Sequence, residues 1–237
     1  MKILFEDNFN YTGKPDSTKW GYETGNGNDG FGNQESQYYT DSIKNAYVSN
    51  GSLKIVSLNE EIEGFHYTSA RLNTYGKFSF TYGKVEILAK IPKGLGSWAA
   101  LWMLPDSLRN GAIWPDSGEI DIMESVGHNQ DVVHCSLHSK KYNHIINTQK
   151  TFFKPIENAS DDFHLYAVDW QKEFIAFYYD DVEVARFARN GENFEGYPFT
   201  TPFHLILNTA VGGSWGGKID KASLPYIFEI KSVRVTE

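Results

Sequence analysis

Apolar and polar residues alternate along much of this 237-residue chain. In the segment GKVEILAKI, residues 83–91, the apolar positions Val85, Ile87, Ala89 and Ile91 alternate with Lys84, Glu86, Leu88 and Lys90. Successive side chains of a β-strand point to opposite faces, so this period of two predicts a strand with one buried face.

Other segments carry the same signal. Residues 161–170, 174–188 and 202–211 are aromatic and β-branched runs interrupted by Asp, Gly or Pro, which is typical of strands. Asn50-Gly51 and Asp180-Asp181 predict tight hairpin turns. A helical period is sustained nowhere for three turns, so helices should be few and short. Gly25, Gly27 and Gly30 have dinucleotide-loop spacing, but no helical pattern follows them, and we expect a groove-wall loop.

These strands predict the fold class. There is no linker, repeat or low-complexity tract, so residues 1–237 are expected to form a single domain. Many short strands in one unbroken domain predict an all-β sandwich of two stacked antiparallel sheets. A bent sandwich has a concave face, and such a face offers a long open groove for a ligand.

Composition narrows the possible partners. The chain is 41% hydrophobic, with 16 Phe, 14 Tyr and 6 Trp, and we place Trp20 and Trp170 in the core. Its net charge of −8 argues against nucleic acid and anionic membranes. No apolar run is long enough to cross a bilayer, and Cys135 has no partner for a disulfide. We expect a monomer.

The segment WPDSGEIDIMES, residues 114–125, carries three acids with uneven spacing. On a strand, Glu119 and Asp121 share one face, while Ile120 and Ile122 face the core. Regular alternation would bury Glu124 with the isoleucines. One extra residue near Met123, inserted as a β-bulge, would return Glu124 to the face of the other acids.

Three acids on one face suggest chemistry, because like charges in line destabilise a sheet. Hydrolysis of a glycosidic bond requires two carboxyl groups, one of them protonated. Glu119 and Glu124 could lean to within the about 5.5 Å expected of a retaining enzyme. Repulsion from Asp121 would raise the pKa of one neighbour and keep it protonated. The alternatives are a solvent-exposed acidic strand and a calcium site.

Several segments in order resemble glycoside hydrolase family 16, and within it the laminarinases, which are endo-1,3-β-glucanases. They are GFGNQESQYYT, TSARLNTYGKFSFTYGKVEILAKIP, GSWAALWMLP, WPDSGEIDIMESVGHN, FHLYAVDW, NTAVGGSWGG and the final VRV. The resemblance implies a concanavalin-like jelly roll and a retaining double displacement. Glu119 would be the nucleophile, Glu124 the acid/base, and Asp121 a hydrogen-bond partner of the nucleophile.

The resemblance also implies groove residues. Trp98 and Trp102 lie four apart, so they share one strand face, and they match sugar-binding positions together with Trp114, Trp215 and Asn33. Arg71 would reach a sugar hydroxyl, with a structural salt bridge as the alternative. Asn208 is either a groove amide or a satisfied core amide. His134 and His138 share a strand face, and we expect His138 to lie near Glu124. As a zinc pair they are poorly spaced on a strand.

Family members often bind one structural calcium on the convex side, through carbonyls near the N-terminus and Gly51 and an aspartate before the final VRV. Lys231 stands at the aspartate position here. An ammonium group cannot ligate calcium, so we expect no metal or cofactor, with Lys231 filling the hole and donating to the same carbonyls.

The predicted function is retaining endo-hydrolysis of β-1,3-glucosidic bonds in β-glucans such as laminarin. The alternatives are mixed-linkage β-1,3-1,4-glucan hydrolysis, another activity of the family such as galactan hydrolysis or transglycosylation, and a non-catalytic glucan-binding module. A polysaccharide substrate predicts an extracellular or periplasmic location, with a signal peptide that this chain does not include. Linkage preference depends on loop shape at the groove ends, which the sequence does not reveal.

Overall fold

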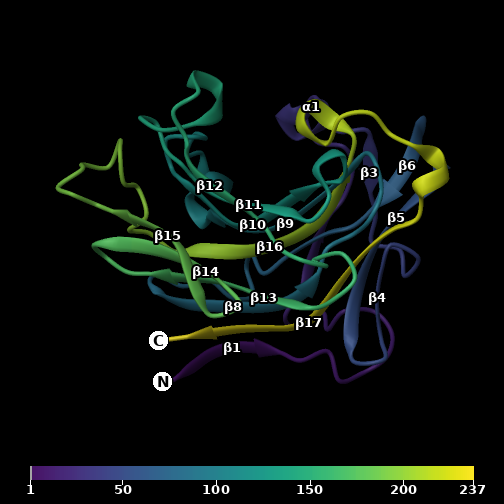
Figure 1. The fold of residues 1–237 in the computed structure, drawn as a ribbon, viewed down its shortest axis with the longest axis horizontal. Helices are drawn as coiled ribbons and strands as arrows, with labels where there is room; N and C mark the ends of the chain where they lie inside the picture. Colours follow the sequence, from purple (N-terminus) through teal and green to yellow (C-terminus); the bar gives the residue numbers. More distant parts are fainter. Residues whose placement is uncertain (1) are drawn as a thin grey trace.

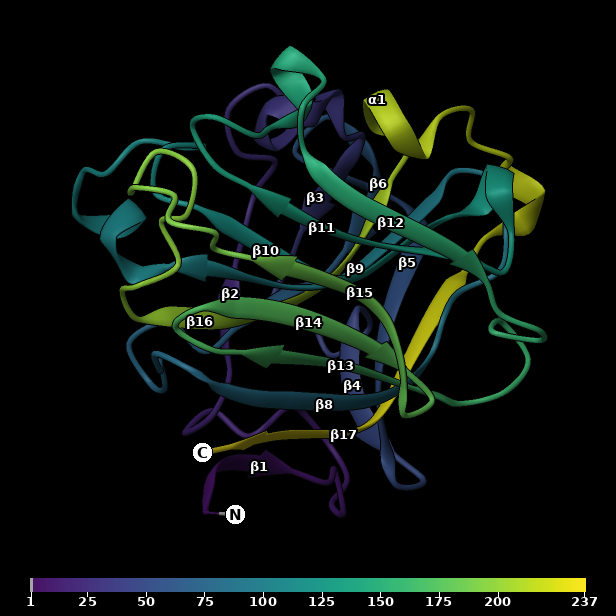
Figure 2. The same cartoon turned by 60° about the vertical axis from the view of Figure 1, so that its left-hand side comes forward.

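Two stacked β-sheets make up the protein in a computed structural model that describes residues 2–237 (Figure 1). The larger sheet contains, in spatial order, β15 (Val182–Ala188), β14 (Phe174–Tyr179), β13 (His164–Trp170), β8 (Gly83–Lys90), β17 (Tyr226–Thr236), β5 (Ser52–Ile62), β6 (Phe65–Ser69) and β3 (Gln37–Tyr39). Two further strands join this sheet, β1 (Ile3–Asp7) on β17 and β4 (Ala46–Ser49) on β5. Figure 2 follows the sheet from β15 down to β17 and β1.

The smaller sheet carries the groove. Its order is β12 (Lys150–Pro155), β11 (Val132–His138), β10 (Glu119–Val126), β9 (Ser97–Pro105), β16 (Phe203–Val211), β7 (Arg71–Asn73) and β2 (Gly21–Glu23). All its strand pairs are antiparallel, and β3–β6 in the larger sheet form a parallel pair. The sandwich of antiparallel sheets is therefore confirmed, apart from that one pair.

Helical segments are short, as predicted. They are η1 (Gly30–Gln34), η2 (Asp106–Asn110), η3 (Gly127–Asn129), η4 (His144–Ile146), α1 (Gly213–Gly216) and η5 (Lys221–Ser223). Within residues 2–237, none of them has the length and apolar character needed to cross a bilayer.

The core lies between the sheets and follows the alternation of the sequence. Val85, Ile87 and Ala89 on β8 are fully buried, and so are Ile120 and Ile122 on β10. Burying a valine or isoleucine side chain contributes about 1.5–3 kcal/mol. The period-two pattern therefore fixes which face of each strand turns inward.

Both predicted hairpins are present. Asn50 and Gly51 join β4 to β5 with φ angles of 51° and 70°, and Asp180 and Asp181 join β14 to β15 with φ angles of 49° and 62°. Two-residue turns of this kind require positive φ at both positions, which Asn, Asp and Gly tolerate best.

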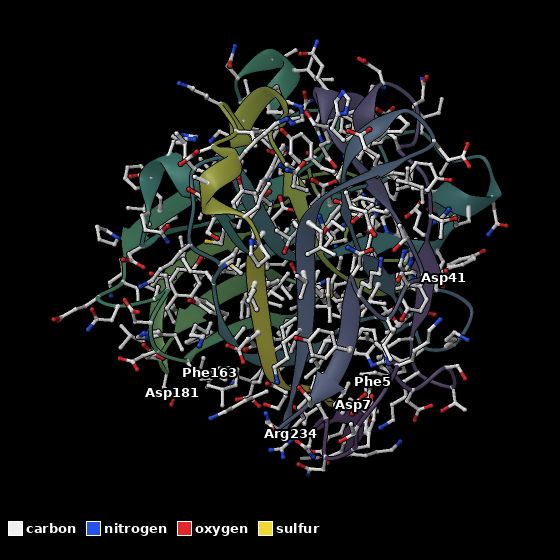
Figure 3. The ribbon with its side chains drawn as sticks, turned by 90° about the vertical axis from the view of Figure 1, so that its right-hand side faces the viewer. Phe5, Asp7, Asp41, Phe163, Asp181 and Arg234 are labelled. Atoms are coloured by element: carbon white, nitrogen blue, oxygen red, sulfur yellow. The ribbon has the colours of Figure 1, made fainter. Side chains whose placement is uncertain are left out.

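The chain ends meet on the larger sheet, where β1 pairs with the end of β17. Figure 3 shows Phe5, Asp7 and Arg234 together at this edge. The buried carboxylate of Asp7 accepts a hydrogen bond of 2.9 Å from the indole Nε1 of Trp20. Trp20 and Trp170 are buried, as predicted.

Candidate active site

A β-bulge on β10 places the three acids. Asp121 pairs with Trp102 on β9, but Met123 rather than Ile122 pairs with the next residue, Leu101, and the register against β11 shifts over the same stretch. Ile122 and Met123 are consequently both buried. Glu124 returns to the face of Glu119 and Asp121, as the spacing predicted.

These acids line a solvent-open cavity of about 850 Å³ on the smaller sheet. Figure 1 shows the β11–β12 connection and α1 rising on opposite sides of this sheet. The cavity brings together every site residue expected from the sequence, namely Asn33, Arg71, Trp98, Trp102, Trp114, Glu119, Asp121, Glu124, His138, Asn208 and Trp215.

The pKa values of all three carboxyl groups are raised. Burial is the largest cause for Glu119, and repulsion from Asp121 is the second. Burial also leads for Asp121, followed by repulsion from Glu124, and it leads for Glu124. The sequence predicted one raised pKa and named repulsion as the cause. Desolvation in the groove is the larger effect, and it acts on the whole cluster.

Two tryptophans bond directly to the acids. The indole Nε1 of Trp114 donates to Oε2 of Glu119 at 3.0 Å, and Nε1 of Trp98 donates to Oε1 of Glu124 at 3.0 Å. Each bond favours the charged carboxylate and therefore lowers the pKa of its partner. The sequence predicted only sugar contact for these rings.

The prediction that His138 lies near Glu124 is wrong. The register pairs His138 with Glu119, and Glu124 pairs with His134. Nε2 of His138 lies 3.2 Å from Oδ2 of Asp121 and 3.8 Å from Oε1 of Glu119. The antiparallel register causes the difference, because it places the end of β11, with His138, opposite the start of β10, with Glu119.

Arg71 and Asn208 each fit both of their predicted alternatives. Arg71 lines the cavity, yet its Nε lies 2.9 Å from Oε2 of Glu23 in a salt bridge. Its guanidinium also lies over the ring of Trp102, 4.8 Å from the centroid. Asn208 accepts a hydrogen bond from Nε1 of Trp102 at 2.7 Å, so the amide is satisfied while it faces the groove.

One carboxyl group in the groove wall was missed. Glu35 is 8% exposed, and burial raises its pKa. Gln37 and Tyr39 donate hydrogen bonds to it at 2.7 and 3.4 Å. Its charge raises the pKa of Glu124. Glu35 follows Asn33 by two residues in a segment already assigned to the groove, so that proximity was the available signal.

The far wall of the groove was also missed. Phe153 on β12 and Ile145 on η4 line the cavity while remaining 62% and 66% exposed. Phe153 packs against His134, with ring centroids 5.5 Å apart. Exposed apolar side chains that line a groove suit the apolar face of a sugar ring.

Metal binding has two candidate places in residues 2–237. Ligand atoms of Glu119, Asp121 and His138 lie within 4.8 Å of one another, inside the acid cluster. The other place is the loop around Gly51, which the family resemblance suggested. There the ammonium of Lys54 donates to the carbonyls of Ser49 and Ser52.

Lys231 does not fill a hole at that loop, so this part of the sequence prediction is wrong. It is exposed, and its ammonium lies over the ring of Phe163, 4.3 Å from the centroid. Figure 3 labels Phe163 low on the molecule. A different lysine, Lys54, supplies the donors at the loop.

The raised pKa of Glu119 predicts that this carboxyl destabilises the fold near neutral pH. Because the folded state holds this proton more tightly, its contribution to stability is present below the unfolded pKa and is lost as pH rises through the folded pKa. Glu119→Gln should therefore raise Tm by about 2–4 °C near pH 7. Thermal melts test this, and the gain should shrink near pH 4. A variant that melts below the wild type near neutral pH would contradict it.

Comparisons with known proteins agree with this geometry. The profile of "Glycosyl hydrolases family 16" matches residues 33–227. The chain is 47% identical to a beta-glucanase of Rhodothermus marinus, over 99% of this chain and 84% of that protein. It is 36% identical to glucan endo-1,3-beta-glucosidase A1 of Niallia circulans, over 99% of this chain but 38% of that protein. The X-ray structure of the laminarinase from Rhodothermus marinus superposes with a TM-score of 0.95 at 46% identity, covering 99% of this chain and 96% of that one.

The sandwich and its acid-lined groove define an enzyme of the glycoside hydrolase class. More narrowly, the chain belongs to glycosyl hydrolases family 16.

Proposed function

We propose that this protein hydrolyses internal β-1,3-glucosidic bonds of β-glucans such as laminarin, with retention at the anomeric carbon. The observation that carries the proposal is the bulge in β10, which directs Glu124 into the same open groove as Glu119. Two carboxyls flanking one bond are what glycosidic hydrolysis requires. The similarity to the beta-glucanase and laminarinase of Rhodothermus marinus supports a β-glucan as the substrate.

In the first step, a carboxylate oxygen of Glu119 attacks the anomeric carbon as the glycosidic C–O bond breaks. Glu124 gives its proton to the departing oxygen, so the leaving chain departs as a neutral alcohol. The burial that raises the pKa of Glu124 keeps this proton available. The products are a glycosyl ester on Glu119 and an ionised Glu124.

In the second step, water attacks the same carbon and gives its proton to Glu124. The ester bond breaks, and Glu119 leaves as a carboxylate. Two inversions at one carbon give net retention. Burial raises the pKa of Asp121, and in its protonated form Asp121 can donate a hydrogen bond to Glu119 instead of repelling it. The attraction of His138 lowers the pKa of Glu119, so both groups then favour the ionised nucleophile.

Product analysis on laminarin, curdlan and lichenan tests the proposal. We expect new reducing ends from laminarin and curdlan, released early as oligosaccharides, with β-anomers seen first by proton NMR. Preferred cleavage of lichenan would support the mixed-linkage alternative. Glucan binding without cleavage would favour a binding module and overturn the proposal, although a module has no use for three crowded acids.

We further propose that the enzyme acts as a monomer outside the cytoplasm. Polymeric glucan does not cross membranes, so the enzyme and its substrate must meet outside the cell or in the periplasm. The groove is complete within one chain. Size-exclusion chromatography with light scattering and fractionation of the native source test the two parts separately.

We also propose that no structural calcium binds at the loop around Gly51, because Lys54 supplies an ammonium there and Lys231 replaces a carboxylate. A ligand that binds only the folded state raises its stability. Tm should therefore be the same in excess calcium and in EDTA, to within about 1 °C. A rise of several degrees with calcium but not with magnesium would contradict this prediction.

A further inference from the structure

Each of the two outer acids has one oxygen held by an indole N–H. Trp114 stands in the loop before β10 and bonds to Oε2 of Glu119, whereas Trp98 comes from β9 and bonds to Oε1 of Glu124. Both distances are 3.0 Å. The register places Ala100 opposite Glu124, so Trp98 reaches the acid diagonally across the two strands.

The third indole on the groove floor does something else. Nε1 of Trp102 donates to the amide oxygen of Asn208 at 2.7 Å and not to an acid. Trp102 therefore offers the same ring chemistry in the same cavity without a carboxyl partner. This difference separates the two uses of an indole, stacking against sugar and binding a carboxyl group.

We propose that Trp98 and Trp114 are positioning residues whose N–H groups assign the two oxygens of each acid to different tasks. The proposal rests on the proposed hydrolase function. The oxygen bound to the indole anchors the carboxyl group, and the other oxygen does the chemistry.

The chemistry follows from what an indole can do. Indole N–H is a donor only, so the oxygen that accepts it carries no proton directed at the ring. The acidic proton of Glu124 therefore sits on Oε2, from which it passes to the glycosidic oxygen. Likewise Oε2 of Glu119 accepts the indole N–H of Trp114, so the free oxygen, Oε1, forms the bond to the anomeric carbon.

The same anchors serve both half-reactions. After the glycosidic bond breaks, Glu124 is ionised and the N–H of Trp98 continues to donate to Oε1. The free oxygen, Oε2, then takes the proton of the attacking water. Neither indole gains or loses a proton, so the groove needs no rearrangement between the two steps.

Both bonds act within a dense set of ionisable groups, which also set the pKa values of the acids. The groups are Asp121 from β10, His134 and His138 from β11, His144 from η4, Arg71 from β7 and Glu35 beside η1. Replacing an indole by a phenyl ring leaves these neighbours in the chain. A change in the pKa of Glu119 or Glu124 in such a variant therefore reports the lost indole hydrogen bond.

Both substitutions should raise the pKa of a carboxyl group, but they act on opposite limbs of the pH profile. Loss of a donor raises the pKa of a carboxyl group. In Trp114→Phe the nucleophile then ionises at higher pH, so the acidic limb of kcat/KM moves up and the profile narrows. In Trp98→Phe the acid/base keeps its proton to higher pH, so the alkaline limb moves up and the profile broadens.

The test measures kcat/KM against pH for Trp98→Phe, Trp114→Phe and the matched control Trp102→Phe. We expect one limb to move up by about one pH unit in each of the first two variants. In Trp102→Phe both limbs should stay in place while KM rises through lost stacking. Unmoved limbs in both of the first two variants, with KM raised, would overturn the proposal and leave the rings as sugar platforms only.

A second measurement does not depend on turnover. Carboxyl groups of ¹³C-labelled glutamate can be titrated by NMR in the substrate-free protein, with Glu119→Gln and Glu124→Gln identifying the signals. We expect the affected signal to titrate at higher pH in Trp98→Phe and Trp114→Phe. Unchanged titrations in folded variants would reject the hydrogen-bond roles. A wild type that releases no sugar from any β-glucan would instead reject the hydrolase function.

Discussion

Glu119→Ala is expected to lower kcat on laminarin by roughly 10⁴-fold or more, with oligosaccharide affinity near the wild-type value and no loss of Tm. A covalent nucleophile divides one difficult displacement into two easier ones, and its removal abolishes that route. Affinity should survive, because Trp98, Trp102 and Arg71 line the groove and are held by partners other than this carboxyl. Initial rates of reducing-end release and calorimetric titration with a laminari-oligosaccharide measure the two effects.

Chemical rescue of this variant tests the role of the residue as well as its importance. Azide can enter the space left by Glu119 and attack the anomeric carbon of an aryl β-glucan oligosaccharide with a good leaving group. A single inversion would yield an α-glycosyl azide. A β-glycosyl azide, or a wild-type rate in the absence of azide, would show that another group is the nucleophile.

Glu124→Ala is expected to lower kcat on laminarin by about 10²–10⁴-fold, the usual contribution of a general acid. The loss should be much smaller on an aryl glycoside whose leaving group needs no proton. There the glycosyl ester on Glu119 should accumulate, because no base activates the water. Comparison of the two substrates under steady-state and burst conditions measures this difference.

Azide again separates the roles. In Glu124→Ala it attacks the ester already formed on Glu119, and two inversions yield a β-glycosyl azide. The two variants should therefore give products of opposite anomeric configuration from one substrate. If the configurations were exchanged, the roles of Glu119 and Glu124 would be exchanged too. If Glu124→Ala lost as much activity on the aryl glycoside as on laminarin, a general disturbance of the groove would explain the loss better than a missing acid.

Local sequence patterns predicted most of the fold. Alternation in residues 83–91 predicted the buried face of β8, and the Asn50-Gly51 and Asp180-Asp181 turns predicted two hairpins. The single step of three residues between Asp121 and Glu124 predicted the bulge. These features are set by residues close together in the chain, where the period of side-chain direction and the φ preferences of turn residues apply directly.

Contacts between distant segments were harder to predict. His138 was expected beside Glu124, but the register before the bulge places it against Glu119 and Asp121. Lys231 was expected at the loop around Gly51, where Lys54 is found instead. A register is decided by the packing of whole sheets, and a shift of one residue changes every partner along a strand.

The sequence by itself determined that this chain is a β-sandwich, which side chains face its core, and that three acids share one face of one strand. Only the tertiary structure decided which oxygen each indole occupies, which histidine meets which acid, and how strongly the groove desolvates its charges. The reason is physical. Side-chain alternation is a property of a single strand, whereas hydrogen-bond partners and burial depend on neighbours that the fold brings from elsewhere in the chain.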